Sequence, residues 1–455
     1  MSDSRRDLAD LSLCEAASAI RAGRISAEQL MMRYVERIRL YEPRIHAWAF
    51  HNADRALEEA RKADRALRAG ESLGPLHGVA VAFKDIIYTK GIPTRMGSPI
   101  FGDFVPEYSA ACVERLEQAG AIVHGKTVTT EFANVHPGPT TNPWNIEFTP
   151  GGSSSGSAAA VAARFTGAAL GSQTRGSIIR PAVFCGVVGY KPSFGAISRF
   201  GMYPQSWTLD HVGIISRSVD DAALLAACLV GHDARDRGSV RETTLLQKVA
   251  ELDDLAAPPR LASVRSPLWS TASQPQQRLF EANCRALRQR GAHMEDVDLP
   301  DAFNASNEVC RLIQLAEMAH SYREHVAGSL SRLSAGLRAL CERGARYTAM
   351  EYMAALELRE RLRRELASFF ARFDAIVTPP AAGEAPRTLA STGDAAFCAL
   401  WSLCGVPSVA FPTGIGPNGL PMGLQVVGPY LEDRRALQVA KWCQQNLPFE
   451  VRPPV

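Results

Sequence analysis

The sequence predicts an α/β protein with a mixed, mostly parallel central β-sheet that α-helices cover on both sides. The apolar run Val79–Phe83 predicts a buried strand, a helical segment follows at about 109–119, and Ala121–His124 predicts a second strand. Strand, helix and strand in this order are typical of βαβ units. Apolar runs bounded by Gly and Pro return near the C-terminus and predict further strands at 373–380, 406–412 and 421–428.

Two helices are predicted before the first strand. Ser26 and Gln29 have the spacing of a capping box, and an apolar stripe follows them. We therefore expect a helix that begins at Ser26 and stops at Pro43. A second, charged helix is expected over 54–69.

The alanine-rich run 157–163 predicts a helix, and 233–372 has the composition of long charged helices with strands near 261–265 and 293–299. We find no repeats and no long flexible linker. We therefore expect one domain, 1–455. Its parts are N-terminal helices in 1–70, a core in 70–230, a helical elaboration in 233–372, and C-terminal strands and a helix in 373–455.

The composition is that of an ordinary globular protein. Hydrophobic residues make up 46% and charged residues 21%. The formal net charge of +3 is too small to indicate a nucleic-acid-binding surface. The ten cysteines lack a Cys-x-x-Cys pair, so no metal site is expected. The first residues are polar, and no apolar stretch is long enough for a membrane span. We expect a reduced, cytoplasmic protein.

Lys84 interrupts the first apolar strand, where a lysine is unusual. In one interpretation it pairs with Asp85 or extends to the surface. In the other it is a desolvated amine, whose pKa falls from about 10.4 because burial disfavours the charged form. Such an amine can act as a general base for a hydroxyl nucleophile.

Two serine-bearing glycine loops follow Lys84 in the chain. The first is Gly151–Ser157, with three consecutive serines, and the second is Gly171–Ser177, which continues to Pro181. A desolvated amine, small hydroxyls and backbone amides supported by glycines are the groups that acyl transfer needs in the absence of histidine. No metal and no cofactor is required for that chemistry.

The first loop also fits two weaker interpretations. Gly152–Gly156 satisfies the Gly-x-Ser-x-Gly pattern centred on Ser154, but that motif needs a preceding strand, and two prolines interrupt 142–150. Asp210 and His211 could complete a triad, although adjacency in sequence does not place them there. A glycine-rich loop before a helix can also bind phosphate, but no Gly-Lys-Ser/Thr follows.

Together, Lys84, the Gly-Gly-Ser-Ser loop and the Gly-Ser-Ile-Ile-Arg-Pro run resemble the amidase signature family in order and spacing. The resemblance covers roughly 70–230 and returns at 418–425, and it is nearest to malonamidase-type members. It implies the amidase signature fold and a cofactor-free, metal-free hydrolase that cleaves the C–N bond of a small carboxamide. The expected partner is therefore a small-molecule amide substrate, with no nucleic acid and no membrane.

The resemblance also implies catalytic roles. Lys84 corresponds to the catalytic lysine, Ser153 to a bridging serine that follows a cis peptide bond, and Ser177 to the nucleophile that forms an acyl-enzyme. The oxyanion would be held by backbone N–H groups of the second loop, at Thr174, Arg175, Gly176 and Ser177.

The second loop departs from the family pattern. Gln173 stands where the family has an acid, and Arg175 stands where it usually has glycine. An arginine would be strained there if the position needs positive φ. Arg175 is either solvated or at the mouth of the active site, where it would impair larger substrates or bind an anion.

Arg180 lies three residues after the nucleophile, as in malonamidase-type members, where it binds the substrate carboxylate. The alternative is a structural salt bridge under the loop. We expect a substrate such as malonamate, bound by Arg180, Gln173 and Ser154.

Three functions are compatible with these motifs. The first is an amidohydrolase that acts as a homodimer without other proteins. The second is a transamidase-type subunit of an amidotransferase, which works with partner chains. The third is a catalytically silent binding protein on the same scaffold, which the unusual Arg175 suggests.

Overall fold

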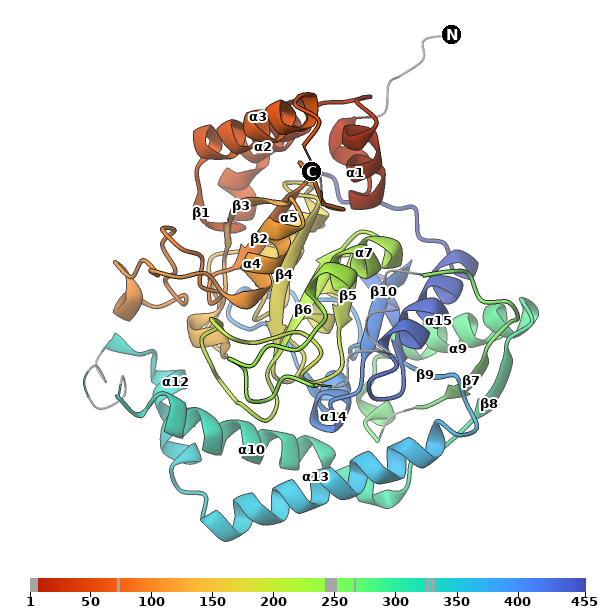
Figure 1. Cartoon of the computed structure of the whole chain (residues 1–455). Coiled ribbons are helices and arrows are strands. Elements are labelled where there is room, and N and C mark those ends of the chain that lie inside the picture. The colour runs from red at the N-terminus through yellow and green to blue at the C-terminus, as the bar shows by residue number, and fades with distance from the viewer. Residues whose placement is uncertain (1–6, 72–73, 242–251, 266, 325–327, 329–331) are drawn as a thin grey trace.

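The computed structural model describes residues 7–71, 74–241, 252–265, 267–324, 328 and 332–455. A mixed sheet of eleven strands lies at its centre (Figure 1), in the order β1-β3-β2-β4-β6-β5-β10-β11-β9-β7-β8. The strands are β1 Trp48–His51, β2 Ala80–Lys84, β3 Ile122–Thr127, β4 Ala168–Gln173, β5 Val188–Lys191, β6 His211–Ser216, β7 Arg260–Ser263, β8 His293–Asp296, β9 Ala375–Thr378, β10 Ser408–Ile415 and β11 Pro421–Val427.

The predicted mixed sheet is confirmed, but the share of parallel strands is smaller than the sequence indicated. Neighbours are parallel in β3-β2-β4 and in β9-β7-β8, and every other neighbouring pair of these strands is antiparallel. The reason lies partly in the connections. Only a few residues separate β10 from β11, and a short link of this kind joins antiparallel strands.

Helices cover both faces of the sheet, as predicted. On β4, Ala169 packs in the cluster under α5 (Ser155–Ala162) and α6 (Ile179–Phe184), whereas Leu170 belongs to the large cluster on the other face. Successive residues of a strand point to opposite faces, so an uninterrupted apolar strand can bury both. The opposite face is covered by α4 Ala111–Gln118, α7 Val219–Leu229, α9 Gln274–Gln289 and α15 Asp433–Asn446.

The N-terminal helices are α1 Leu13–Arg21, α2 Ala27–Ile45 and α3 Ala53–Arg68. The capping box at Ser26 is confirmed, because its side chain accepts from the Gln29 backbone and the Gln29 side chain accepts in return. The predicted stop at Pro43 is wrong. The helix continues to Ile45, which is completely buried, and ends at His46 with φ 53°. Burial of Ile45 offsets the helix bond that a proline removes.

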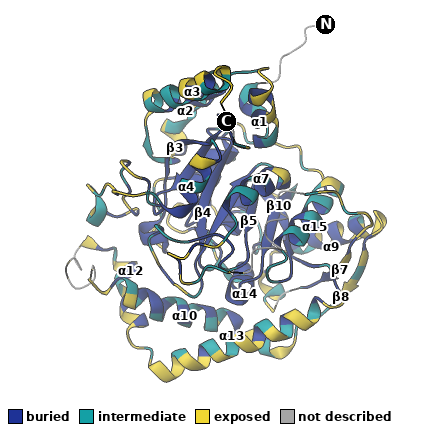
Figure 2. Cartoon of the chain, viewed as in Figure 1, coloured by how far each residue is buried: buried dark blue, intermediate teal, exposed yellow. Residues whose placement is uncertain are grey.

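The remaining helices are α10 Ser306–Ser321, α12 Ala335–Gly344, α13 Ala349–Phe369 and α14 Ala396–Cys404. Helices α10, α12 and α13 form a layer below the sheet in Figure 1, and α10 contacts α12, α13 and α14. Figure 2 shows a buried sheet and an exposed outer face on α13. The predicted strands near 261–265 and 293–299 are confirmed as β7 and β8. Short 3-10 helices lie at Leu8–Asp10, Pro99–Phe101, Glu131–Ala133, Trp269–Thr271 and Asp301–Ala305.

None of the helices in the described part of the chain combines the length and the apolar composition that a membrane crossing requires.

Candidate active site

Lys84 ends strand β2 with its side chain completely buried. Its Nζ donates to Ser153 Oγ at 2.6 Å and to Ser172 Oγ at 2.8 Å. Burial holds the pKa of Lys84 well below its ordinary value. The alternative of a pair with Asp85 is wrong, since that carboxylate lies 3.9 Å from Lys126. The site therefore contains a buried amine, bonded to two hydroxyls, whose charged form is disfavoured by burial.

Ser153 lies in the loop before α5, and the Gly152–Ser153 peptide bond is cis, as the resemblance implies. This loop lies directly against the second one. Gly151 has φ +81°, and a Cβ there would lie 2.7 Å from Pro181 Cα, so no other residue fits without a shift. Ser154 N also donates to Ser177 O at 3.3 Å, which joins the two loops through their backbones.

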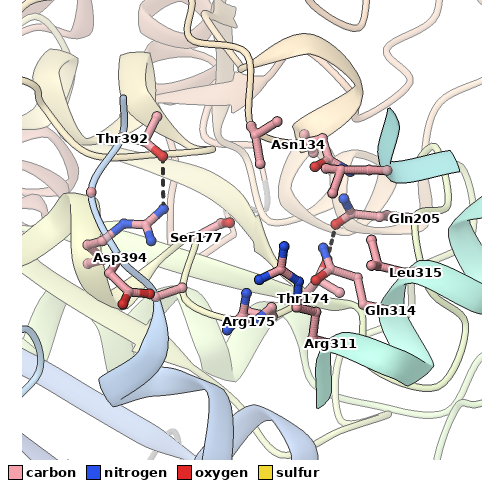
Figure 3. Close-up of a pocket in the computed structure, with 16 residues that line it drawn as sticks. Asn134, Thr174, Arg175, Ser177, Gln205, Arg311, Gln314, Leu315, Thr392 and Asp394 are labelled. Atoms are coloured by element: carbon pink, nitrogen blue, oxygen red, sulfur yellow. Dashed lines mark hydrogen bonds between the residues drawn. The ribbon is translucent and has the colours of Figure 1, made fainter. Parts of the chain in front are cut away.

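Ser177 lies between β4 and α6 and lines a cavity of about 200 Å³. Figure 3 shows its hydroxyl at this cavity. Among the described residues, no hydrogen bond joins the Ser177 hydroxyl to Ser153. The structure thus contains the link from Lys84 to Ser153, and it brings Ser177 next to the serine loop. The Ser177 hydroxyl has no hydrogen-bond partner within the described part of the chain.

The second loop leaves several amides without a protein partner. Among the described residues, no hydrogen-bond acceptor faces the N–H groups of Arg175, Gly176 and Ser177. The loop itself is held from both sides. The Thr174 hydroxyl donates to Asp210 Oδ1 at 2.6 Å, and Ser402 Oγ, on α14, donates to the Arg175 carbonyl at 2.7 Å.

Arg175 has no positive φ, so the strain considered from the sequence does not arise. Its Nη2 donates to Asn307 Oδ1 at 3.1 Å, and its side chain lines the cavity. Of the two interpretations, the structure supports the position at the active-site mouth.

The expectation that Gln173 and Ser154 bind substrate is wrong, because both side chains are buried and bonded inside the protein. Gln173 Oε1 accepts from the backbone N–H groups of Ile178 and Ile179 at 2.8 and 3.0 Å. This amide oxygen ties the start of the loop to the beginning of α6. The Ser154 hydroxyl donates to the Ser172 carbonyl at 3.2 Å.

The Ser-His-Asp interpretation is also wrong. His211 Nδ1 lies 3.2 Å from the Gln173 carbonyl and its Nε2 lies 3.4 Å from Lys191 Nζ, so the ring faces neither Ser154 nor Asp210. Burial holds the pKa of His211 well below its ordinary value. No strand precedes Ser154 within the described residues 128–153.

Arg180 is buried on α6 and also lines the cavity. One of its terminal nitrogens donates to the Gly152 carbonyl at 2.6 Å and lies 3.2 Å from Thr392 Oγ1. Burial lowers the pKa of Arg180 to about 10, so the guanidinium stays protonated at neutral pH. Among the described residues it forms no ion pair, so the alternative of a structural salt bridge is wrong.

Sequence reasoning missed three side chains of the site. Ser172 is the second partner of Lys84; it lies on β4, although the sequence predicted a loop from Gly171, and its place beside Gly171 was the only available signal. Gln205 lines the cavity, and its side-chain nitrogen is buried without a hydrogen-bond partner. Arg311 reaches the cavity from α10, and nothing in its sequence surroundings distinguishes it from other helix arginines.

No group of three or more His, Cys, Asp or Glu side chains within the described residues is placed to hold a metal ion.

The comparison with known proteins agrees with this geometry. The Amidase family matches residues 29–437. The chain belongs to the amidase signature family. It is an enzyme that acts on amide C–N bonds.

Relatives of this amidase cover nearly its whole length. The glutamyl-tRNA(Gln) amidotransferase A-subunit of Synechococcus sp. (strain CC9311) is 34% identical over 98% of this chain and 99% of its own. Its counterpart in Anaeromyxobacter sp. (strain K), which has the same name, is 34% identical over 100% of both chains. The peptide amidase of Stenotrophomonas maltophilia is 30% identical, with a TM-score of 0.86 over 98% of each chain. A particular likeness to malonamidase-type members is not confirmed.

Proposed function

We propose that this amidase hydrolyses the C–N bond of a small carboxamide through an acyl-enzyme on Ser177, with Ser153 and Lys84 as the proton relay. The observation that carries the proposal is the buried amine of Lys84, which lies 2.6 Å from the Ser153 hydroxyl and 2.8 Å from the hydroxyl of Ser172 on β4, the strand that leads to Ser177.

The relay begins with an uncharged amine. Because burial lowers the pKa of Lys84, its nitrogen is unprotonated at a lower pH than that of an exposed lysine and can then accept a proton. Ser153 passes its proton to Lys84 as it takes the proton of Ser177, whose oxygen attacks the substrate carbonyl. In this proposal the Ser177 side chain turns toward Ser153 when substrate binds, and the backbone hydrogen bond from Ser154 to Ser177 keeps the two loops together.

The developing oxyanion is held by backbone N–H groups of Thr174, Arg175, Gly176 and Ser177. Donors of this kind are worth about 3–4 kcal/mol each in comparable enzymes. The protonated Lys84 then returns its proton through Ser153 to the departing nitrogen, and the C–N bond breaks. Water, deprotonated by the same pair, attacks the ester of Ser177 and releases the acid. One water molecule is consumed in each cycle.

The substrate we propose is an amide that carries a carboxylate, such as malonamate. The support is the position of Arg180, which is protonated, lines the cavity and lies three residues from Ser177. A guanidinium binds a carboxylate through two parallel hydrogen bonds, which fixes its orientation.

A second candidate function is that of a transamidase-type subunit. The observation that favours it is the 34% identity to the amidotransferase A-subunit over nearly the whole of both chains. In that case partner chains would supply an acceptor for the ammonia. The organisation as one domain, the homodimer and the cytoplasmic location remain predictions for either function.

Ammonia release by the purified chain, with a panel of charged and neutral amides, tests the proposal. A hydrolase turns over alone, and the expected result is ammonia together with the free acid. A transamidase-type subunit would stay inactive until partner chains are added. A silent binding protein would bind amides without releasing ammonia in either condition, which would overturn the proposal.

A further inference from the structure

The charged side chains that line the cavity are mostly positive. Three arginines line it, Arg175, Arg180 and Arg311, against a single carboxylate, Asp394. None of the three forms an ion pair within the described residues. The Nε atoms of Arg175 and Arg180 are buried without a hydrogen-bond partner. Buried cationic donors without partners are costly, so this arrangement is typical of a site that an anion completes.

In the view of Figure 3, the arginines lie on two sides of Ser177. In Figure 3 the Ser177 hydroxyl lies between Thr392 and the pair Arg175 and Arg311. Arg180 lies on the side of Ser177 that carries Thr392, because one of its terminal nitrogens is 3.2 Å from Thr392 Oγ1.

Arg175 and Arg311 lie on the side of Ser177 opposite Thr392 in that view. Arg175 donates to Asn307, which lies one helical turn before Arg311 on α10. Residues four apart share a face of a helix, so Asn307 directs Arg175 toward the face that carries Arg311. Arg311 itself has no side-chain partner in the described part of the chain.

We propose that the substrate carries two acidic groups, one on each side of the scissile amide. The acid of the acyl part binds Arg180, and an acid on the amine part binds Arg175 and Arg311. This inference rests on the proposed function and names its substrate class. Hydrolysis adds water across the C–N bond, so the products are a dicarboxylic acid and an amino acid.

The cavity size restricts the length of such a substrate. At about 200 Å³ it is smaller than the roughly 300–1,000 Å³ of sites for drug-sized ligands. Short acids on both sides therefore fit best. N-malonylglycine is a suitable probe with both acids. N-methylmalonamate has only the acyl acid, N-acetylglycine has only the amine acid, and N-methylacetamide has neither.

Calorimetry on the Ser177→Ala variant measures binding of the four probes without turnover. N-malonylglycine is expected to bind roughly tenfold to a hundredfold more tightly than either single acid, because each charge-assisted contact contributes about 1.5–3 kcal/mol. Adding Arg175→Gln or Arg311→Gln should weaken N-malonylglycine at least about tenfold more than N-methylmalonamate. Equal losses for both probes, or no preference for two acids, would overturn the inference.

A matched control removes one positive charge elsewhere. Arg361→Gln lies on the exposed face of α13, outside the cavity, and should change no affinity by more than about twofold, because exposed pairs contribute little. Turnover separates the two proposals. If the wild-type chain releases no amine from any probe while the binding pattern holds, the proposed hydrolysis fails and the two-acid site stands. If amides are hydrolysed without preference for N-malonylglycine, only the two-acid site fails.

Discussion

The Lys84 amine lies 2.6 Å from the Ser153 hydroxyl oxygen, and both side chains are buried. A lysine in this position has no carboxylate partner among the described residues and no access to solvent. Burial disfavours its charged form and so lowers its pKa, and the uncharged form is the one that accepts a proton. The same burial that destabilises the charged lysine is what the proposed role of Lys84 as a base requires.

Ser177→Ala should abolish the acyl-enzyme. Intact-mass spectrometry after rapid quenching should show the added acyl group on the wild-type chain and none on the variant, because the attacking oxygen is absent. Ser155→Ala is the matched control. Its hydroxyl donates to the Gly151 carbonyl within the first loop, and the adduct should persist. An adduct that survives in Ser177→Ala would remove Ser177 from its role.

Lys84→Met should lower kcat/KM by about 10²–10⁴-fold, the usual contribution of a positioned general base. Methionine keeps most of the volume and removes the amine. Lys90→Met makes the same change at an exposed position and should keep nearly full activity. Steady-state kinetics on both variants provides the comparison. Comparable rates for wild type and Lys84→Met would contradict the relay.

The stability difference between wild type and Lys84→Met should depend on pH. The pKa of Lys84 is lowered in the folded state, so above that pKa and below about 10.4 the unfolded chain binds the extra proton. Stability of the wild type should therefore rise with pH relative to the variant, by up to about 1.4 kcal/mol per pH unit. Urea unfolding at pH 7, 8 and 9 measures this slope. Parallel curves would mean that folded Lys84 is charged.

Gln173→Ala should destabilise the protein by about 2–4 kcal/mol, because it leaves the backbone N–H groups of Ile178 and Ile179 without an acceptor. Gln173→Glu is the informative control, since its carboxylate can still accept from both amides and should retain more of the stability. Thermal or urea unfolding measures the loss. If both substitutions instead raise KM without loss of stability, Gln173 contacts the substrate after all.

Arg180→Ala should reduce kcat/KM for malonamate far more than for an uncharged aryl amide, by roughly a further tenfold to hundredfold. Some loss with both substrates is expected, because Arg180 also binds the Gly152 carbonyl. The ratio of the two losses is therefore the relevant measurement. A ratio near one would show that Arg180 supports the loop and does not recognise the acid.

Local patterns in the sequence were sufficient for many elements, but they did not predict the central strands β4, β5 and β6. Apolar runs and the capping box at Ser26 predicted several strands and the start of α2, because burial and capping depend on neighbouring residues. These patterns failed where contacts between residues far apart in the sequence determine whether an element forms. Strand β1 was missed, since its four residues are only half-buried and it pairs with β3. The helix across Pro43 depends on the burial of Ile45 by other elements.

For the site, the sequence by itself determined which groups are present. A lysine in an apolar strand and two serine loops indicated the kind of chemistry, and the resemblance to the amidase signature family then singled out Lys84, Ser153 and Ser177, whose catalytic roles stay a prediction. Only the tertiary structure determined what the residues around these three side chains do. It made Gln173 a support for the loop, added Ser172 as a second partner of the amine, and brought arginines from separate elements to one cavity. Such convergence depends on the packing energy of the whole chain, which no local window of sequence contains.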